Sequence, residues 1–119
     1  MKFAHVTIMV RNLEESIGFY KDIVGLPIVK RFPAGPGMEI AFLGEGETLV
    51  ELIQNDNLEN IELGKDISIG FEVESLDKTM EFVRDKGIQI HSGPFQPNPS
   101  TRYLYVQDPN GLKIQFIEH

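Results

Sequence analysis

Apolar and polar residues alternate over residues 3–10, a period of two that predicts a β-strand. Asn12 follows, with apolar residues at helical spacing after it and Gly25 at their end, which predicts a capped amphipathic helix. Three more apolar stretches, bounded by glycine or proline, predict strands over residues 26–31, 39–43 and 48–54. The first half of the chain therefore predicts the element order β-α-β-β-β.

The second half predicts the same order of elements. Residues 67–73 alternate as a strand does, and Ser75 and Gly87 bound a second amphipathic helix. The segment Asp108-Pro-Asn-Gly111 is a strong turn sequence between the last two strands. The three strands that follow the helix are predicted over residues 88–91, 103–107 and 112–118.

The two halves match each other residue by residue. His5–Phe19 aligns without a gap on Ser68–Phe82, at an offset of 68 − 5 = 63. Near the ends of the halves Glu51 aligns on Gln115, at an offset of 115 − 51 = 64. A repeat of this length indicates two copies of one supersecondary unit, and sites in such folds usually lie where the copies meet.

We expect an α+β fold of two βαβββ modules. Each helix covers one face of a curved mixed sheet, and the two uncovered faces enclose a cleft. By strand parity, the residues that point into this cleft include His5, Glu51, Ser68 and Gln115. The expected organisation is a single domain over residues 1–119, with module 1 at about 1–56, a polar linker at 57–65 and module 2 at about 66–119.

Two proline-containing loops are predicted at equivalent places in the modules, at residues 32–37 and 93–101. Loops of this length can cover a cleft as lids or select its ligand. Plain connections stiffened by proline explain them equally well, so the sequence leaves both roles open.

Composition narrows the classes of function. A chain of 119 residues, 41% of them hydrophobic, is long enough for one domain with its own core. It contains no Cys, which excludes disulfides, thiolate metal sites and Cys nucleophiles. The net charge of −7, with eleven scattered Lys and Arg residues, argues against nucleic acid as a partner. The apolar run at the start is too short and too polar for a signal peptide or a membrane span, so we expect a cytoplasmic protein with no membrane partner.

Several segments together are typical of one protein family. They are His5-Val, Asn12-Leu-Glu, Phe19-Tyr20-Lys-Asp-Ile-Val-Gly25-Leu, Val-Glu51-Leu, Phe71-Glu-Val-Glu-Ser-Leu76 and Tyr103-Leu-Tyr-Val-Gln-Asp-Pro-Asn-Gly111. With them the chain resembles, over essentially its whole length, the vicinal oxygen chelate superfamily of glyoxalase I, bleomycin-resistance proteins and extradiol dioxygenases. This resemblance is specific for the fold, but the superfamily carries many reactions.

The resemblance implies a metal site shared by two modules, with ligands at His5, Glu51, Ser68 and Gln115. His5 and Glu51 are good ligands for Zn²⁺, Ni²⁺, Mn²⁺ or Fe²⁺. Gln115 offers a neutral amide oxygen, which is a weaker ligand, and Ser68 stands where the family usually has His. Glyoxalase-type isomerisation also needs a carboxylate that moves a proton, and Glu51 is the candidate for this catalytic role.

Five further residues are candidates for binding a substrate. In the family pattern Arg102, Tyr103 and Tyr105 border the cleft, although packing also explains the two tyrosines. Glu72 shares a strand face with Ser68 and can equally be solvent-facing, while His91 lies before a proline-containing loop, where a rim or surface position is favoured. The candidates are Glu72, His91, Arg102, Tyr103 and Tyr105.

Two functions from different classes follow from the resemblance. The first is a metal-dependent lyase or isomerase of glyoxalase type, or a related vicinal-oxygen enzyme, that acts on a small oxygenated substrate. The second is a metal-free binding protein of bleomycin-resistance type. His5 and Glu51 favour the enzyme, Ser68 and Gln115 favour the binding protein, and the family implies a homodimer in either case.

Overall fold

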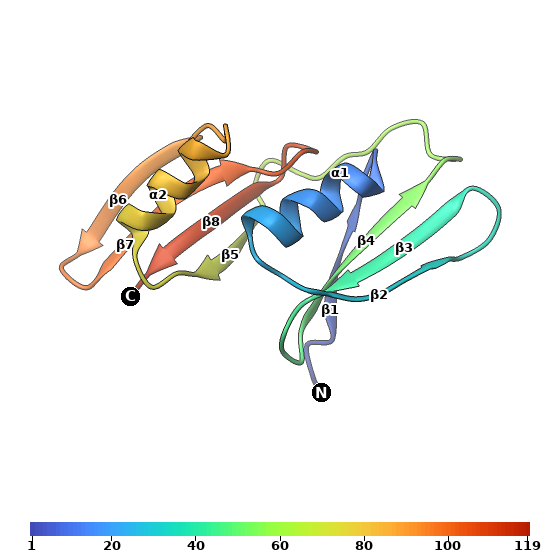
Figure 1. Ribbon diagram of the computed structural model, residues 1–119, viewed down its shortest axis with the longest axis horizontal. Helices are drawn as coiled ribbons and strands as arrows, with labels where there is room; N and C mark the ends of the chain where they lie inside the picture. The colour runs from blue at the N-terminus through green and yellow to red at the C-terminus, as the bar shows by residue number, and fades with distance from the viewer. The chain divides into compact units, whose positions relative to one another are not determined.

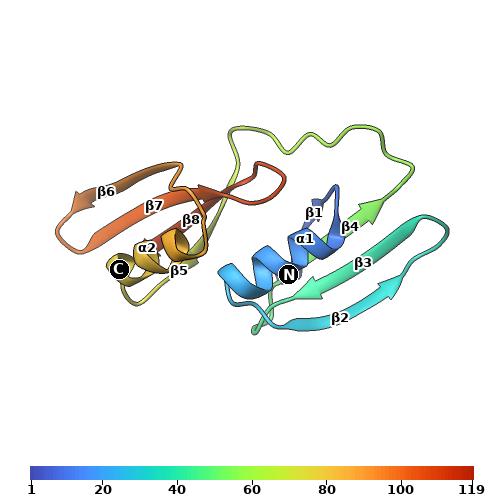
Figure 2. The same ribbon diagram turned by 45° about the horizontal axis from the view of Figure 1, so that its top comes forward.

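The computed structural model describes residues 1–119, which form two compact units, Met1–Leu63 and Gly64–His119. The boundary between the units falls inside the predicted linker at 57–65. No helix or strand lies between Asn55 and Ser68, and Figure 2 shows this segment as a long irregular connection. Each unit contains one four-stranded mixed sheet with helical structure beside it (Figure 1), so the predicted α+β fold of two βαβββ modules is confirmed.

The first unit has its strands in the order β1-β4-β3-β2. Strands β1 and β4 are parallel, whereas the other neighbours are antiparallel. Helix α1 packs against β3 and β4. The elements are β1 (His5–Met9), α1 (Leu13–Gly18), η1 (Phe19–Ile23), β2 (Ile28–Pro33), β3 (Met38–Leu43) and β4 (Leu49–Asn55).

The second unit repeats this topology with the strand order β5-β8-β7-β6. Here β5 and β8 are the parallel pair, and α2 packs against β8. The elements are β5 (Ser68–Glu72), α2 (Leu76–Asp85), β6 (Ser92–Asn98), β7 (Thr101–Gln107) and β8 (Lys113–Glu118). The predicted turn joins β7 to β8, because the Asp108 carboxylate accepts hydrogen bonds from the backbone N–H groups of Asn110 and Leu112.

The first helix is capped as the sequence predicts but does not stay α-helical to its end. The Asn12 side chain accepts a hydrogen bond from the Glu15 N–H at 2.9 Å, and α1 starts there. From Phe19 the chain continues as the π-helical segment η1, closed by a 3.1 Å bond from the Val24 N–H to the Phe19 carbonyl. Phe19 and Tyr20, at the start of this segment, are both buried.

Each helix is also tied to the last strand of its own sheet. The N–H of Leu13 donates to Gln54 Oε1 at 2.6 Å, and the N–H of Leu76 donates to Glu118 Oε1 at 2.7 Å. Gln54 and Glu118 are separated by 118 − 54 = 64 positions, the same offset that relates Glu51 to Gln115. These bonds satisfy helix N–H groups that have no partner within the helix, and they hold the helix on one face of the sheet.

The hydrophobic core lies between each helix and its sheet. In the first unit the side chains of Ile8, Val10, Leu43, Val50 and Leu52 are at most 5% exposed. In the second unit the corresponding side chains Leu104, Val106, Ile114 and Phe116 are at most 2% exposed. Burial of each such side chain stabilises the fold by about 1.5–3 kcal/mol. Because side chains alternate along a strand, the neighbours of these buried residues point to the opposite face of the sheet.

One predicted strand lies elsewhere. Residues 88–91 form no strand, and β6 (Ser92–Asn98) instead occupies most of the segment predicted as a proline-containing loop. Because β6 is at the edge of its sheet and pairs irregularly with β7, Pro94 and Pro97 are tolerated there. In the first unit β2 likewise extends to Pro33, which leaves a shorter loop than predicted.

Candidate functional site

The sheet face opposite the helix carries the candidate chemistry in each unit, and we call it the helix-free face. On the first sheet the registered residues Thr7, Glu51, Phe42 and Lys30 form one row across the four strands of this face. On the second sheet Gly70, Gln115 and Tyr105 form the equivalent row. The alternation of side chains along strands places these rows on the side away from α1 and α2.

His5 and Thr7 of β1 converge on the carboxylate of Glu51 in β4. Thr7 Oγ1 donates a hydrogen bond to Glu51 Oε1 at 2.6 Å, and His5 Nε2 lies 3.5 Å from the same oxygen. The Glu51 side chain is 13% exposed and that of His5 is 42% exposed. Parallel pairing of β1 with β4 puts Thr7 directly opposite Glu51 and His5 one step along the same face. The Glu51 carboxylate is thus oriented by one neighbour while Oε2 accepts no hydrogen bond.

Aromatic rings frame this group on the β3 side. The His5 ring meets the Phe42 ring edge to face, with centroids 5.6 Å apart, and Phe42 stacks with Phe32 at 6.4 Å. Lys30 Nζ lies 4.8 Å from the centroid of the Phe42 ring. Rings in these arrangements restrain both the imidazole and the ammonium.

The equivalent group in the second unit has different chemistry. Gln115 Nε2 donates to the Tyr105 hydroxyl at 3.3 Å, which directs the amide oxygen toward Gly70. A Cβ atom on Gly70 would lie 2.9 Å from Gln115 Oε1, so glycine provides the room for this amide. Ser68, which aligns with His5, is exposed on the same face. At these equivalent positions Ser68 and Gln115 therefore offer neutral oxygens where the first unit offers an imidazole and a carboxylate.

The His5–Glu51 pair fits the separation of two ligands on one divalent ion. Two ligands at about 2.1 Å from a tetrahedral ion lie about 3.4 Å apart, and His5 Nε2 and Glu51 Oε1 are 3.5 Å apart. An imidazole nitrogen and a carboxylate oxygen suit Zn²⁺, Ni²⁺, Mn²⁺ or Fe²⁺. No group of three or more His, Asp or Glu side chains gathers in the structure. His5 and Glu51 are therefore the only two such ligands that come together on this face.

The structure separates the predicted substrate-binding residues. Tyr103 and Tyr105 lie on the helix-free face of the second sheet, with ring centroids 5.8 Å apart. Arg102 points to the opposite face, where its guanidinium contacts Asp77 of α2 at 3.2 Å. The strand alternation of β7 therefore removes Arg102 from the tyrosines with which the family pattern grouped it.

Glu72 and His91 also lie apart from each other. Glu72 is on the helix-free face of β5, but its side chain is 69% exposed and its carboxylate contacts His119 Nδ1 at 2.8 Å. His91 precedes β6 and lines a hollow of about 250 Å³ together with Lys65, Gln107 and Lys113. His91 thus borders a basic hollow of the second unit, whereas Glu72 is an exposed partner of another histidine.

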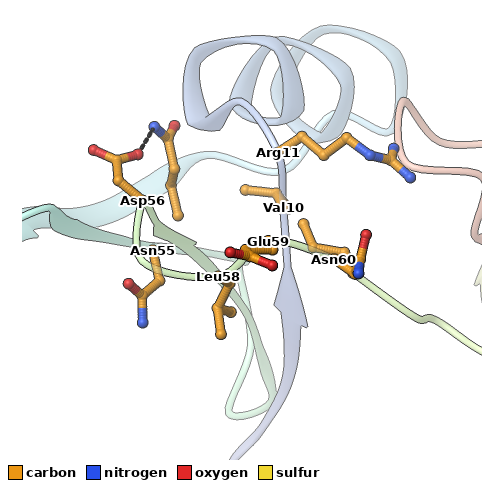
Figure 3. A pocket seen from close by; sticks show the side chains of 9 residues that line it. Val10, Arg11, Asn55, Asp56, Leu58, Glu59 and Asn60 are labelled. Atoms are coloured by element: carbon orange, nitrogen blue, oxygen red, sulfur yellow. Dashed lines mark hydrogen bonds between the residues drawn. The ribbon is translucent and has the colours of Figure 1, made fainter.

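A larger hollow of about 370 Å³ lies at the far end of β1 and β4 in the first unit. Figure 3 shows Val10 and Arg11 on one side of it and Asn55, Asp56, Leu58, Glu59 and Asn60 around it. Its polar wall includes the Asp56 carboxylate, which accepts a hydrogen bond from the Gln54 amide at 3.0 Å. None of the predicted site residues lines this hollow, and four of its nine lining residues come from the segment predicted as a linker.

A charged cluster on the helix side of the first sheet is centred on Arg31. Arg31 contacts Glu39 through Nε and Oε2 at 2.7 Å and also forms an ion pair with Glu14 of α1. The hydrogen bond from Arg31 lowers the pKa of the Glu39 carboxyl, and the bonds to Glu39 and Glu14 raise the pKa of the Arg31 guanidinium. These contacts fasten α1 to its sheet and engage the Arg31 guanidinium with two carboxylates.

Four residues of the two faces escaped the sequence prediction. Thr7 follows His5 by two positions, so strand parity alone was a sufficient signal for it. Gly70 lies between Ser68 and Glu72 and was recognisable in the same way. Phe42 and Lys30 become neighbours of Glu51 only through the pairing register of β2, β3 and β4, which the sequence does not reveal.

No helix of the structure is both long enough and apolar enough to cross a membrane. Comparison with solved structures places the fold beside glyoxalase I of Zea mays. The two superpose with a TM-score of 0.87 at 25% identity, over 99% of this chain and 44% of that chain. This chain thus spans less than half of the length of the maize chain.

Curated relatives agree with the fold. A lactoylglutathione lyase of Haemophilus influenzae is 35% identical over an alignment that covers 100% of this chain and 93% of the relative. A lactoylglutathione lyase of Neisseria meningitidis is 32% identical, with 99% of this chain and 91% of the relative covered. Residues 2–116 match the family described as the Glyoxalase/Bleomycin resistance protein/Dioxygenase superfamily. The chain therefore belongs to the glyoxalase/bleomycin resistance protein/dioxygenase superfamily, whose paired βαβββ modules it has.

Proposed function

We propose that this protein is a divalent-metal-dependent lyase or isomerase of the lactoylglutathione lyase kind, or a related enzyme, acting on a small substrate with two neighbouring oxygens. The observation that carries the proposal is the 3.5 Å approach of His5 Nε2 to Glu51 Oε1 on one sheet face. Relatives of nearly the same length that are named lactoylglutathione lyases support the reaction class.

The proposed ligands are His5 and Glu51, with Gln115 as a weaker donor and Ser68 as the weakest. When bound, the ion supplies Lewis-acid stabilisation of negative charge on the substrate oxygens. The residues of the chain do the rest. Thr7 holds Glu51 Oε1 through its 2.6 Å hydrogen bond, and the Phe42 ring packs against the edge of the His5 imidazole.

Glu51 is the proposed proton carrier of the reaction. Its Oε2 accepts no hydrogen bond, so this oxygen can accept the proton that an isomerisation moves between neighbouring carbons. Gln115, the equivalent residue of the second module, has an amide that cannot accept a proton at neutral pH. The two roles of ligand and base therefore fall on a single carboxylate.

The second candidate function is a metal-free protein that binds a small molecule, as bleomycin-resistance proteins do. Its support is the neutral chemistry of Ser68 and Gln115 and the aromatic surface of Tyr103 and Tyr105.

In both candidate functions we propose a homodimer as the working form. Light scattering at micromolar protein should give twice the chain mass, and a monomer would contradict the dimer.

The reaction is tested with metal-free protein reconstituted separately with Zn²⁺, Ni²⁺ or Mn²⁺. Formation of lactoylglutathione from methylglyoxal and glutathione is followed by chromatography. Turnover that requires one of the ions and is lost in Glu51→Gln supports the lyase. The binding function is supported instead if none of the reconstituted forms turns over and the metal-free protein binds an organic ligand tightly.

A further inference from the structure

The two neighbouring cations of β2 have opposite surroundings. Arg31 points to the helix side, where Glu14 and Glu39 both contact it. Lys30 points to the helix-free face, and the ion pairs of the first unit leave it out. Only aromatic rings hold its ammonium group, which lies 4.8 Å from the Phe42 centroid and 5.7 Å from the Phe32 centroid.

Lys30 belongs to the same row of residues as Glu51. The register runs from Lys30 to Phe42 and from Phe42 to Glu51, so that one residue separates the lysine from the carboxylate across the sheet. Neighbouring strands are about 4.8 Å apart, which puts the two backbones at about 10 Å. The Phe42 ring lies between the two groups, since it contacts His5 beside Glu51 on one side and the Lys30 ammonium on another.

An ammonium held over phenyl rings keeps its charge and its hydrogen-bond donors. The ring quadrupole attracts the cation but accepts no proton and cancels no charge. A carboxylate or phosphate that reaches Lys30 would form a charge-assisted hydrogen bond against an apolar background. Phe42 and Phe32 would meanwhile contact the carbon skeleton that joins this anionic group to the atoms near His5 and Glu51.

From this arrangement we propose that Lys30 is the specificity-determining residue for an anionic group of the ligand. The ligand class is a small oxygenated compound with two neighbouring oxygens at one end and a carboxylate or similar anion at the other. The inference rests on the proposed function for the position of the oxygens. The charge preference at Lys30 depends only on the first unit's own geometry.

The test uses 3,4-dihydroxybenzoate and 3,4-dihydroxybenzamide as probes. Both carry two neighbouring oxygens on one ring, and they differ in the charge of the group at the opposite end. Binding is measured by calorimetry with the intact protein, in the presence of Mn²⁺ and in its absence. The variants are Lys30→Met, which keeps the length of the side chain, and Lys21→Met on the helical segment η1 as the matched control.

Lys30→Met should weaken binding of the benzoate about fivefold, as expected for one partly exposed ion pair, and leave binding of the benzamide unchanged. Lys21→Met should change neither. Equal losses for both probes, no loss for the benzoate, or no binding of the benzoate by the parent protein would overturn the inference. The loss should appear with and without Mn²⁺, so a failure of the parent to bind metal would contradict the proposed function while leaving the charge preference measurable.

Discussion

The helix-free faces of the two modules have the same backbone frame and different chemistry. In the first module a histidine, a threonine and a glutamate converge, with His5 Nε2 3.5 Å and Thr7 Oγ1 2.6 Å from Glu51 Oε1. In the second module the equivalent positions are Ser68, Gly70 and Gln115, and the amide is oriented by Tyr105 at 3.3 Å. The frame is thus kept by buried residues on the helix side, while the other side of the same strands is free to differ. The first module therefore presents charge and basicity on this face, and the second presents neutral oxygens at the equivalent positions.

The largest expected effect comes from making the first module resemble the second. Glu51→Gln removes the charge and the proton acceptor while keeping the shape of the side chain. Metal affinity should fall by more than about 100-fold, because loss of a partner that merely supports a ligand already costs about 10–100-fold. Glu72→Gln, on the equivalent face of the second sheet, is the control and should leave the affinity unchanged. Equilibrium dialysis with Mn²⁺ measures both, and equal affinities for parent and Glu51→Gln would refute the role of Glu51.

The reverse change makes the second module resemble the first. Gln115→Glu adds a carboxylate at a position where the Tyr105 hydroxyl can donate to it in place of accepting from the amide. Metal affinity should rise about tenfold, in line with a gain of about 1.4 kcal/mol from one more charged ligand. Calorimetric titration with Mn²⁺ decides, with Gln107→Glu on the neighbouring strand as control. An unchanged affinity would mean that Gln115 does not belong to the ligand set.

A smaller effect is expected when the support of Glu51 is removed. Thr7→Val keeps the branched shape and loses the hydroxyl that donates to Glu51 Oε1. Metal affinity should fall about tenfold, and Thr7→Ser, which restores a hydroxyl, should recover most of it. If valine and serine variants bind Mn²⁺ equally well, the threonine only fills space.

Gly70→Ala probes the corresponding position of the second module. The added Cβ would lie 2.9 Å from Gln115 Oε1, so the flexible amide must shift. We expect the distance between Gln115 Nε2 and the Tyr105 hydroxyl to change in a crystal structure of the variant, with little change in stability. An unmoved amide would contradict the crowding that we describe.

The smallest effect concerns the way in which the two helices are fastened. Arg31 joins Glu14 to Glu39 in the first module, whereas Arg102 contacts only Asp77 in the second. Because Arg31 lowers the pKa of Glu39, the stability that Glu39 contributes is present above the unfolded-state pKa of about 4.3 and is lost as pH falls through the lower folded-state pKa. Glu39→Gln should therefore lower the Tm slightly at pH 7 and not at all once Glu39 is protonated in both states. A difference in Tm between the parent and Glu39→Gln that grows toward acid pH would contradict this prediction.

The sequence predicted the architecture because each module repeats strong local signals. Asn12 and Ser75 cap the helices as expected, and the strand alternation around Glu51 and Gln115 places both residues on helix-free faces. The failures have local causes as well. The edge strand β6 contains prolines that resemble a loop, and η1 changes helical register at Phe19 without a sequence signal.

The candidate site was predictable in part. Parity along one strand is local, so the convergence of His5 with Glu51 follows once β1 and β4 are known to be parallel neighbours. Lys30 and Phe42 could not be assigned in this way, because their place in the row of Glu51 depends on the register of two further strand pairs and on a bulge in β2. For Arg102 the family pattern suggested a position in the cleft. Its position along β7 instead directs the side chain toward α2.

The central claim is that His5 and Glu51 form the metal-binding half of the site, and calorimetric titration of the metal-free protein with Zn²⁺, Ni²⁺ and Mn²⁺ tests it most directly. His5→Ala is compared with His119→Ala, because His119 is also a histidine beside a carboxylate, 2.8 Å from Glu72. The account predicts that the parent protein and His119→Ala bind at least one of these ions and that His5→Ala binds none up to millimolar concentration. Equal binding by His5→Ala, or no binding by the parent protein at millimolar metal, would contradict it.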